Sequence, residues 1–158
     1  QAQILDLLKD LQREHRMGLL LITHDLAVVS GMAQRVALMY AGQIIEVASA
    51  DEFFKSPRHP YAQALLRALP DAGRRGEPLA AIAGTVPALT AAFVGCRFAP
   101  RCASETARCA STVPALTPLD PSRSVRCLLY AKGVKRRKLP RRPVLLLECF
   151  GERIPSDV

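Results

Sequence analysis

The sequence lacks several features that would define a broad class of protein at once. No apolar run approaches the roughly 18 residues that a membrane-spanning helix requires, and the chain does not open on the pattern of a secretory signal. The pattern G-x-x-x-x-G-K-[ST], whose backbone amides cradle nucleotide phosphates, is absent, and no internal repeat is visible. We therefore expect a cytosolic protein whose sequence does not by itself supply a phosphate-binding loop.

Size and charge narrow the class further. The chain has 158 residues, 49% of them hydrophobic, which suffices for one domain with a modest core and an appended segment. It begins with Gln1 at the start of a helical pattern, so we expect it to be part of a larger protein. The net charge of +8 is uneven, because residues 130–158 hold 8 Lys/Arg and 3 Asp/Glu. We expect this basic tail to be disordered, and the near-neutral remainder argues against a nucleic-acid surface.

The first part of the chain alternates helical and strand-like patterns. Residues 2–14 carry apolar side chains at helical spacing, and residues 19–22 form a short apolar run typical of a strand buried on both faces. The order of elements predicts an α/β fold, and residues 1–70 contain too few strands for a whole doubly wound domain. Further elements are expected at short intervals: a helix over 26–32, strands over 36–39 and 44–47 around a turn at Gly42, a helix capped by Ser49 and Glu52, and a helix that begins at Pro60.

The composition changes at residue 71. Glycines and prolines break any long element in residues 71–129, and four of the five cysteines fall there, spaced Cys96-x5-Cys102-x6-Cys109-x17-Cys127. We predict a small irregular subdomain over 71–129 that is held together by its own crosslink. Within the tail, the apolar stretch 144–147 reads as a strand.

The four cysteines indicate a metal site more than disulfides, because thiols stay reduced in cytosolic proteins. Thiolates bind both tetrahedral zinc and iron–sulfur clusters. The C-x2-C pairs common in zinc sites are absent, and the wider gaps fit a cluster somewhat better, but spacing alone does not decide between them. Four cysteines that bind nothing are the third alternative.

His24 directly follows an apolar run and Thr23, so we expect it at the carboxyl end of a parallel strand. Open α/β sheets bind their ligands outside such strand ends. A neutral imidazole there could donate a hydrogen bond to a terminal phosphate oxygen or to the attacking water, since phosphoryl transfer depends mainly on positioning and charge stabilisation. A lone histidine at a strand end is also commonly structural, so the neighbouring residues have to distinguish a structural role from contact with phosphate.

The segment from Gly18 to Val29, followed by Arg35 to Glu46, resembles the switch-histidine region of ABC ATPases. The resemblance implies that His24 contacts the γ-phosphate of ATP and helps to organise hydrolysis. This sequence lacks the family's phosphate-binding loop, its L-S-G-G-Q signature, and the Asp-Glu strand that holds Mg²⁺ and the catalytic glutamate. We therefore predict that this chain alone neither binds ATP tightly nor hydrolyses it.

The stretch from His59 to Pro70 looks like the start of the C-terminal extension of dipeptide and oligopeptide importer ATPases, and it continues as Ile82 to Leu89. The resemblance covers roughly residues 1 to 129. We expect His59, Pro60 and Tyr61 to start a helix and to pack in the interior rather than to contact substrate. Some members of the group carry a [4Fe–4S] cluster on four cysteines, so the resemblance implies as ligands Cys96, Cys102, Cys109 and Cys127.

The resemblance implies an energy-coupling ATP-binding subunit of an ABC importer of dipeptides or oligopeptides. Its cofactors would be ATP and Mg²⁺ in the full-length protein, with a [4Fe–4S] cluster or zinc at the cysteines. Its partners would be membrane-spanning permease subunits, a second ATPase subunit and, indirectly, an extracytoplasmic peptide-binding protein. It would be peripheral on the cytoplasmic face of the cell membrane, and no nucleic acid is expected.

Two other interpretations stay open at this point. The chain could be a small iron–sulfur or zinc-binding module whose basic tail binds nucleic acid or another partner. That alternative explains the cysteines and the tail, but it leaves His24 at its strand end and the hairpin at Gly42 unexplained. The unusual tail after residue 130 also keeps open an interrupted gene product with no function of its own.

Overall fold

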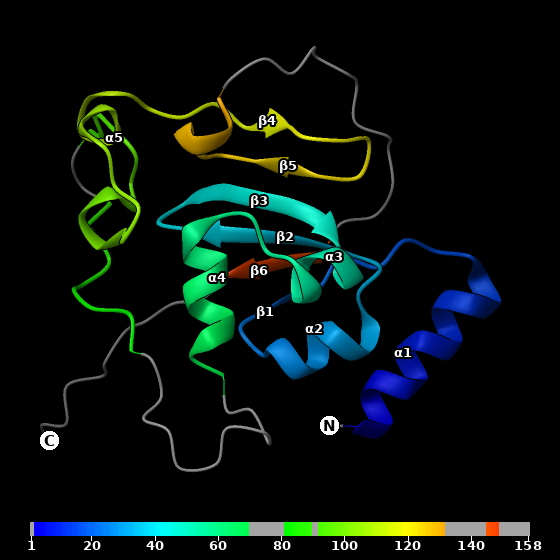
Figure 1. Cartoon of the computed structure of the whole chain (residues 1–158). Helices are drawn as coiled ribbons and strands as arrows, with labels where there is room; N and C mark the ends of the chain where they lie inside the picture. The colour runs from blue at the N-terminus through cyan, green and yellow to red at the C-terminus, as the bar shows by residue number, and fades with distance from the viewer. Residues whose placement is uncertain (1, 70–80, 90–91, 132–144, 149–158) are drawn as a thin grey trace, which may run out of the picture.

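The computed structural model describes residues 2–69, 81–89, 92–131 and 145–148. One sheet with strand order β1-β6-β2-β3-β5-β4 runs through them, and α2, α3 and α4 contribute to its core (Figure 1). This mixed arrangement of helices and sheet agrees with the predicted class. The elements are α1 (Ala2–His15), β1 (Ile22–Thr23), α2 (Leu26–Met32), β2 (Arg35–Tyr40), β3 (Gln43–Ser49), α3 (Ala50–Lys55), α4 (Pro60–Arg67), η1 (Ala99–Arg101), α5 (Ala107–Ser111), β4 (Thr117–Pro118), β5 (Ser124–Val125), η2 (Leu128–Tyr130) and β6 (Leu145–Glu148).

Helix α1 confirms the helical pattern over residues 2–14. It ends at His15, and Arg16 then adopts a left-handed backbone conformation with φ of +47°. Its apolar face is only partly covered by the described residues, since Ile4 and Leu7 are 63% and 59% exposed.

Strand β1 is shorter than the apolar run that predicted it, because only Ile22 and Thr23 take part. It lies at the edge of the sheet and pairs on one side only, with β6. Leu20 and Ile22 are 57% and 61% exposed. The expectation of a strand buried on both faces is therefore wrong for the described residues, because Leu20 and Ile22 stay largely exposed.

The connection from β1 to β2 runs through α2. The Asp25 side chain caps this helix by accepting hydrogen bonds from the backbone N–H groups of Ala27 and Val28 at 2.9 and 3.2 Å, which confirms the predicted cap. Strands β1 and β2 both run parallel to β6, which lies between them. The carboxyl ends of three parallel strands therefore meet at one edge of the sheet.

Strands β2 and β3 form the predicted antiparallel hairpin. Tyr40 pairs with Gln43, which leaves a two-residue turn of Ala41 and Gly42 with φ of +47° and +74°. Positive φ at both central residues is the mirror-image turn whose twist matches that of the flanking strands. The hairpin is the best-paired part of the sheet and supplies most of its buried residues.

The next two helices begin as predicted. Ser49 and Glu52 form a reciprocal capping box at the start of α3, and Pro60 is the first residue of α4. Both helices pack on the face of the sheet that carries alternate side chains of β2. The resulting core contains Leu26, Val29, Val36, Leu38, Tyr40, Ile45, Ala48, Phe53, Tyr61, Ala62 and Phe98.

The segment after residue 80 is integrated with the preceding part more closely than the sequence suggested. Strand β5 pairs antiparallel with β3, and the backbone N–H of Arg126 donates to the Ile45 carbonyl at 2.7 Å. Phe98 is 3% exposed, and its ring lies 5.2 Å from that of Tyr40 and 5.3 Å from that of Tyr61. The two parts thus share one sheet and one core, whereas the sequence predicted an irregular subdomain with its own crosslink. The boundaries at 70 and 129 stay predictions.

The stretch assigned to the basic tail contributes a strand to the same sheet. Leu145–Glu148 form β6, which pairs with β1 on one side and β2 on the other. The sequence predicts a strand-like run at 144–147, but within a disordered tail over residues 130–158. The structure differs for these four residues, and the basic run at 135–142 lies outside the described residues.

Gly95 allows a close approach between two parts of the cysteine-containing segment. A Cβ atom at this position would lie 2.3 Å from the Cys109 carbonyl oxygen and 2.5 Å from that of Ala110. We expect Gly95→Ala to lower the free energy of unfolding by about 2 kcal/mol or more, since backbone atoms have to move. Gly31→Ala in α2 is the control, because nothing lies within 4 Å of its Cβ position. Urea titration that finds the two variants equally stable would contradict this prediction.

Candidate functional site

His24 lies where the sequence predicted, at the carboxyl end of β1. It is exposed, and its neighbours are fixed locally, because the Asp25 N–H donates to the Thr23 hydroxyl at 3.0 Å. In the parallel register Thr23 pairs with Leu147, which pairs with Leu38. His24 therefore belongs to the edge at which β1, β6 and β2 all end, the position where such sheets bind ligands.

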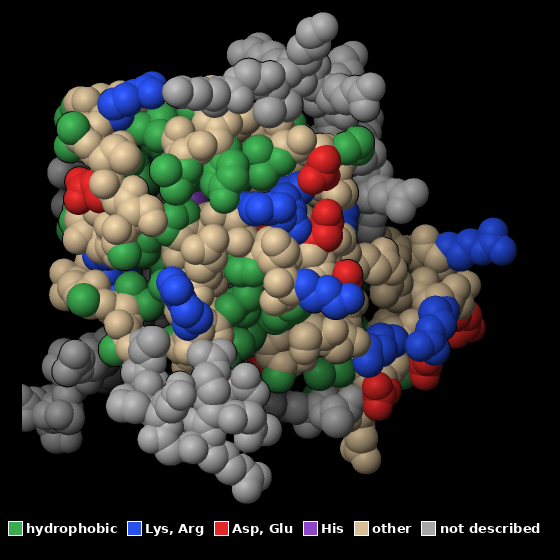
Figure 2. Space-filling model, viewed as in Figure 1, with side chains coloured by type: hydrophobic (Ala, Val, Ile, Leu, Met, Phe, Trp, Pro, Cys, Tyr) green, Lys and Arg blue, Asp and Glu red, His purple; other side chains and the backbone are tan. Residues whose placement is uncertain are grey.

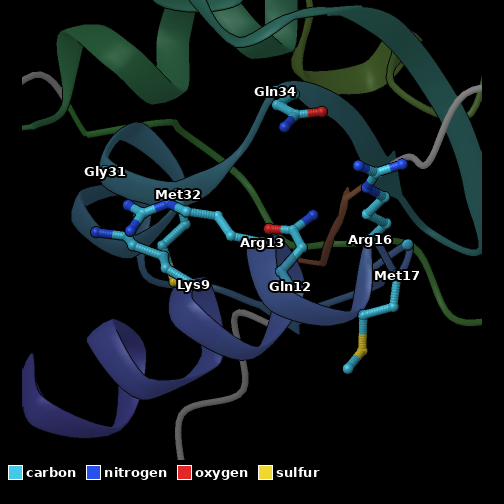
Figure 3. A pocket seen from close by; sticks show the side chains of 9 residues that line it. Lys9, Gln12, Arg13, Arg16, Met17, Gly31, Met32 and Gln34 are labelled. Atoms are coloured by element: carbon cyan, nitrogen blue, oxygen red, sulfur yellow. The ribbon is translucent and has the colours of Figure 1, made fainter.

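A hollow of about 580 Å³ lies between α1 and α2, away from this edge. Figure 3 shows Lys9 and Arg13 of α1 reaching towards Met32 of α2 across it. Lys9 pairs with Asp6 at 3.6 Å and Arg13 with Asp10 at 2.9 Å, so two of its cations already have carboxylate partners. His24 and the four cysteines do not line it, so this hollow is not the predicted site. The residues that line it are Lys9, Gln12, Arg13, Arg16, Met17, Gly18, Gly31, Met32 and Gln34.

The exposed charges of the described chain are mixed in sign. Figure 2 shows acidic and basic side chains next to one another over α1. The ion pairs within α1 and the pair between Lys55 and Asp51 at 2.7 Å are of this kind. The face shown in Figure 2 carries no broad surface of one sign.

The structure brings the four predicted ligand cysteines to one region. The backbone N–H of Cys96 donates to the Cys109 carbonyl at 2.8 Å, and the Thr106 hydroxyl lies 3.3 Å from the Cys109 sulfur. Cys127 is buried, the other three are half-buried, and all four are free thiols. Cys149 lies outside the described residues.

The thiols are close enough to influence one another. Burial raises the pKa of Cys96, Cys102 and Cys127, and each is raised further by neighbouring thiols of the set. Even so, no group of three or more His, Cys, Asp or Glu side chains within the described ranges has an arrangement that could hold a metal ion. The donor set suits zinc or a cluster chemically, while the thiols as placed have not converged to ligating positions.

A buried carboxylate that the sequence did not predict organises the junction between β3 and α4. Glu46 is fully buried, and its carboxylate accepts from the Arg58 N–H at 2.9 and 3.1 Å and from the His59 N–H at 2.6 Å. Burial raises the pKa of Glu46, and these hydrogen bonds together with the Arg123 and Arg58 charges oppose that rise. Its only signal in the sequence is a lone acidic residue within an apolar strand.

His59 has a structural role, as the sequence predicted. It is 1% exposed, and its Nδ1 accepts from the Tyr61 N–H at 3.0 Å, which caps α4. Burial lowers the pKa of His59 to about 4, and a hydrogen bond to the Arg126 backbone opposes this shift. The ring is therefore neutral near pH 7 and links the start of α4 to the strand segment that carries Arg126.

Arginines join the C-terminal segment to the preceding sheet and helices. Arg123 is 3% exposed, donates to the Ser56 carbonyl at 2.9 Å and lies 3.7 Å from the Glu52 carboxylate. Arg126 donates to the Ile44 and Pro114 carbonyls at 2.9 and 3.0 Å. In the sequence the two arginines flank β5, and Arg126 precedes Cys127. The residues whose carbonyl groups accept their hydrogen bonds lie elsewhere in the chain.

Comparison with known proteins identifies the family. Residues 45–109 match the family described as oligopeptide/dipeptide transporter, C-terminal region. The chain is 47% identical over 136 residues to a putative peptide import ATP-binding protein of Brucella ovis. This alignment covers 82% of this chain and 40% of that protein. It is 47% identical over 127 residues to the dipeptide transport ATP-binding protein DppD of Escherichia coli (80% and 39%), and 45% identical over 130 residues to the oligopeptide transport ATP-binding protein AppD of Bacillus subtilis (82% and 40%).

These matches define a class, the ATP-binding proteins of peptide transport, and this chain belongs to that family and matches its C-terminal region. It spans about 40% of the length of the curated relatives that it matches. The matches favour the transporter interpretation, and none of those described above supports the alternative of a small metal-binding module. Within the described residues no helix is both long enough and apolar enough to cross a membrane.

Proposed function

We propose that this chain forms the C-terminal part of an energy-coupling ATP-binding subunit of an ABC importer of dipeptides or oligopeptides. The observation that carries the proposal is 47% identity to the dipeptide transport ATP-binding protein of E. coli over 80% of the chain. In this proposal residues 1–70 belong to an ABC ATPase domain and residues 71–129 to the peptide-importer extension. ATP and Mg²⁺ would bind only where the missing phosphate-binding loop, signature and magnesium-binding strand are supplied.

In the complete subunit His24 would contact the γ-phosphate of ATP. Its exposure at the carboxyl end of β1, next to a capped helix start, supports this role. A neutral imidazole held there would donate a hydrogen bond to a phosphate oxygen or orient the attacking water. The proposed partners are permease subunits, a second ATPase subunit and, indirectly, an extracytoplasmic peptide-binding protein, on the cytoplasmic face of the cell membrane.

A chimera tests the proposal directly. The segment of E. coli DppD that matches this chain is replaced by the corresponding residues of this chain, and dipeptide uptake is measured in cells that lack DppD. We expect the chimera to restore uptake, and His24→Ala within it to lower the uptake rate at least about tenfold, since one positioned hydrogen-bond donor to a developing charge has effects of this size.

The matched control is His15→Ala, which removes an exposed histidine at the end of α1. We expect it to leave uptake within about twofold of the chimera, since surface substitutions have small effects. A chimera that accumulates normally but restores no uptake would contradict the proposed function. Normal uptake with His24→Ala would contradict only the role of His24.

We also propose that Cys96, Cys102, Cys109 and Cys127 hold a [4Fe–4S] cluster, with zinc as the alternative. Their placement in one region, where neighbouring thiols help to raise the pKa values of Cys96, Cys102 and Cys127, supports the proposal. The thiols would have to move into ligating positions from the end of η1, where Cys102 lies, and from α5, which contains Cys109. Bonds from four thiolates would then add folding free energy to this segment.

Anaerobic reconstitution with iron and sulfide tests this proposal. We expect a brown protein that absorbs broadly near about 400 nm and contains about four iron atoms per chain. Cys102→Ser should lose the colour, whereas the control Cys149→Ser should keep it. A colourless protein with about one zinc per chain would favour zinc, and a chain that retains neither metal would contradict a metal site.

A further inference from the structure

Two arginines of the C-terminal segment contact the hairpin formed by β2 and β3. Arg97 donates from Nη1 to the carbonyl of Ala41, in the turn of the hairpin. Arg126 donates from Nε to the Ile44 carbonyl at 2.9 Å and from Nη1 to the Pro114 carbonyl at 3.0 Å. Figure 1 shows the arrowhead of β2 at the end of the sheet where this turn lies. Both guanidinium groups therefore lie near the carboxyl ends of the parallel strands, where such sheets bind ligands.

Neither arginine forms an ion pair with a carboxylate of the described residues. The ion pairs there involve four other basic side chains. Arg97 and Arg126 are both half-buried. Burial lowers the pKa of Arg126, and the nearby charge of Arg97 lowers it further. Two like charges that are partly withdrawn from water repel each other, so this pair lacks a compensating negative charge.

Arg97 also has an unused hydrogen-bonding edge. Its guanidinium lies over the Phe93 ring, with Cζ 4.4 Å from the ring centroid, and this contact orients its plane. Nη1 donates to Ala41, whereas Nε is buried and has no hydrogen-bond partner in the described part of the chain. Nε and Nη2 form the side of the fork that can donate to two oxygens of one anion. An anion there would satisfy a donor that otherwise destabilises the folded state.

We propose that Arg97 and Arg126 form a binding site for a phosphate-type oxyanion. Guanidinium forks match the geometry of phosphate oxygens, and a phosphate group with more than one negative charge can neutralise both cations, whereas a single carboxylate neutralises one. Neither His24 nor a cysteine sulfur takes part, so the site goes beyond the proposed function. Its occupant is either a free phosphate compound or the phosphate part of a nucleotide, and the choice of anion distinguishes the two.

The first test needs no substitution. Inorganic pyrophosphate is added to the full chain at constant ionic strength, and the Nε–Hε resonances of the arginine side chains are followed by NMR. We expect saturable shifts at Arg97 and Arg126 that fit one dissociation constant. Arg13, which already donates to Asp10 at 2.9 Å, should stay unshifted. The absence of a saturable shift at Arg97, or an equal shift at Arg13, would overturn the proposal.

The second test compares variants of the full chain by isothermal titration calorimetry with pyrophosphate. We expect Arg97→Gln to lower the affinity at least about tenfold, because it removes a positive charge and the bidentate fork. Arg97→Lys keeps the charge but not the fork, so its affinity should lie between the two. The control Arg13→Gln should stay within about twofold of the unmodified chain. Unchanged affinity in Arg97→Gln, with circular dichroism showing a folded chain, would overturn the proposal, and the NMR test decides alone if this variant does not fold.

The third test compares anions on the unmodified chain. Pyrophosphate and ATP without Mg²⁺ share the phosphate chemistry, while acetate offers a carboxylate with a single charge. We expect acetate to bind at least about tenfold more weakly than pyrophosphate. Pyrophosphate that binds as tightly as ATP would support a free phosphate compound as the occupant, and tighter binding of ATP would support a nucleotide. Acetate that binds as tightly as pyrophosphate would overturn the proposal, because the site would then only attract negative charge.

Discussion

Replacing Glu46 by alanine is expected to lower the free energy of unfolding by about 3 to 4 kcal/mol. The carboxylate is fully buried and accepts from two consecutive backbone N–H groups, those of Arg58 and His59. Its removal leaves both donors without a partner in the interior and opens a cavity between β3 and the start of α4. A buried unsatisfied donor alone costs about 1 to 3 kcal/mol.

Glu46→Gln separates charge from hydrogen bonding at the same position. The amide oxygen can still accept from one or both backbone donors. Glutamine carries no charge, so the burial that raises the pKa of Glu46 has no ionised group to disfavour in this variant. We therefore expect a smaller loss, about 1 to 2 kcal/mol. Urea titration of the two variants, with circular dichroism as the signal, measures the difference.

The control is Glu14→Ala on the exposed surface of α1, which we expect to change stability by no more than about 0.5 kcal/mol. If Glu46→Ala were as stable as this control, the carboxylate would not organise the junction. If Glu46→Gln were as damaging as Glu46→Ala, the charge rather than the acceptor geometry would be the stabilising feature.

Local sequence signals predicted the local structure of this chain well. Asp25, Ser49 and Pro60 each mark the helix start that the structure contains, because capping depends on atoms within three residues of the cap. Gly42 marked the hairpin for the same reason, since its turn needs a positive φ. The placement of His24 at a strand end followed from these elements.

Contacts between distant segments were not predictable in the same way. The hydrogen bonds from Arg126 to Ile44 and from Arg123 to Ser56 join residues that lie far apart in the chain, and no periodicity in the sequence encodes such pairs. The pairing of β6 with β2 is of the same kind. For that reason the sequence divided the chain into separate parts, while the structure joins them in one sheet.

For the cysteines the sequence predicted a set of ligands but could not predict their geometry. Spacing gives the order of Cys96, Cys102, Cys109 and Cys127, whereas convergence depends on how η1, α5 and η2 pack. The close contact at Gly95 brings the segment with Cys96 together with α5, which contains Cys109, through backbone atoms. In the sequence, a glycine is the only sign of such a contact.

Acidification is expected to destabilise the chain through His59. Its pKa falls from 6.5 to about 4 on folding, because the ring is buried, so the folded state binds fewer protons than the unfolded state between these values. The stabilisation is therefore fully present above about pH 6.5 and is lost as the pH falls towards about 4. The linkage relation gives a loss of roughly 2 kcal/mol by pH 5 and about 3 kcal/mol by pH 4.

His59→Asn isolates this contribution, because asparagine can still cap α4 but does not titrate. The variant loses the ring contact with Phe98 at 5.8 Å and the bond to the Arg126 backbone, so we expect it to be less stable at pH 7.5. The difference in free energy of unfolding between the two chains should then narrow as the pH falls, because only the unmodified chain loses stability when the ring is protonated.

Urea titrations at intervals between pH 7.5 and pH 4 measure this difference in free energy of unfolding. The raised pKa of Glu46 and the lowered pKa values of Glu52 and Asp120 also make stability depend on pH, but these groups are present in both chains and largely cancel in the difference. His15→Asn, on the exposed end of α1, controls for the loss of one histidine. A gap between the unmodified chain and His59→Asn that stays constant over this range would show that His59 is not held neutral by burial, and the coupling of α4 to the strand segment through this ring would then have to be abandoned.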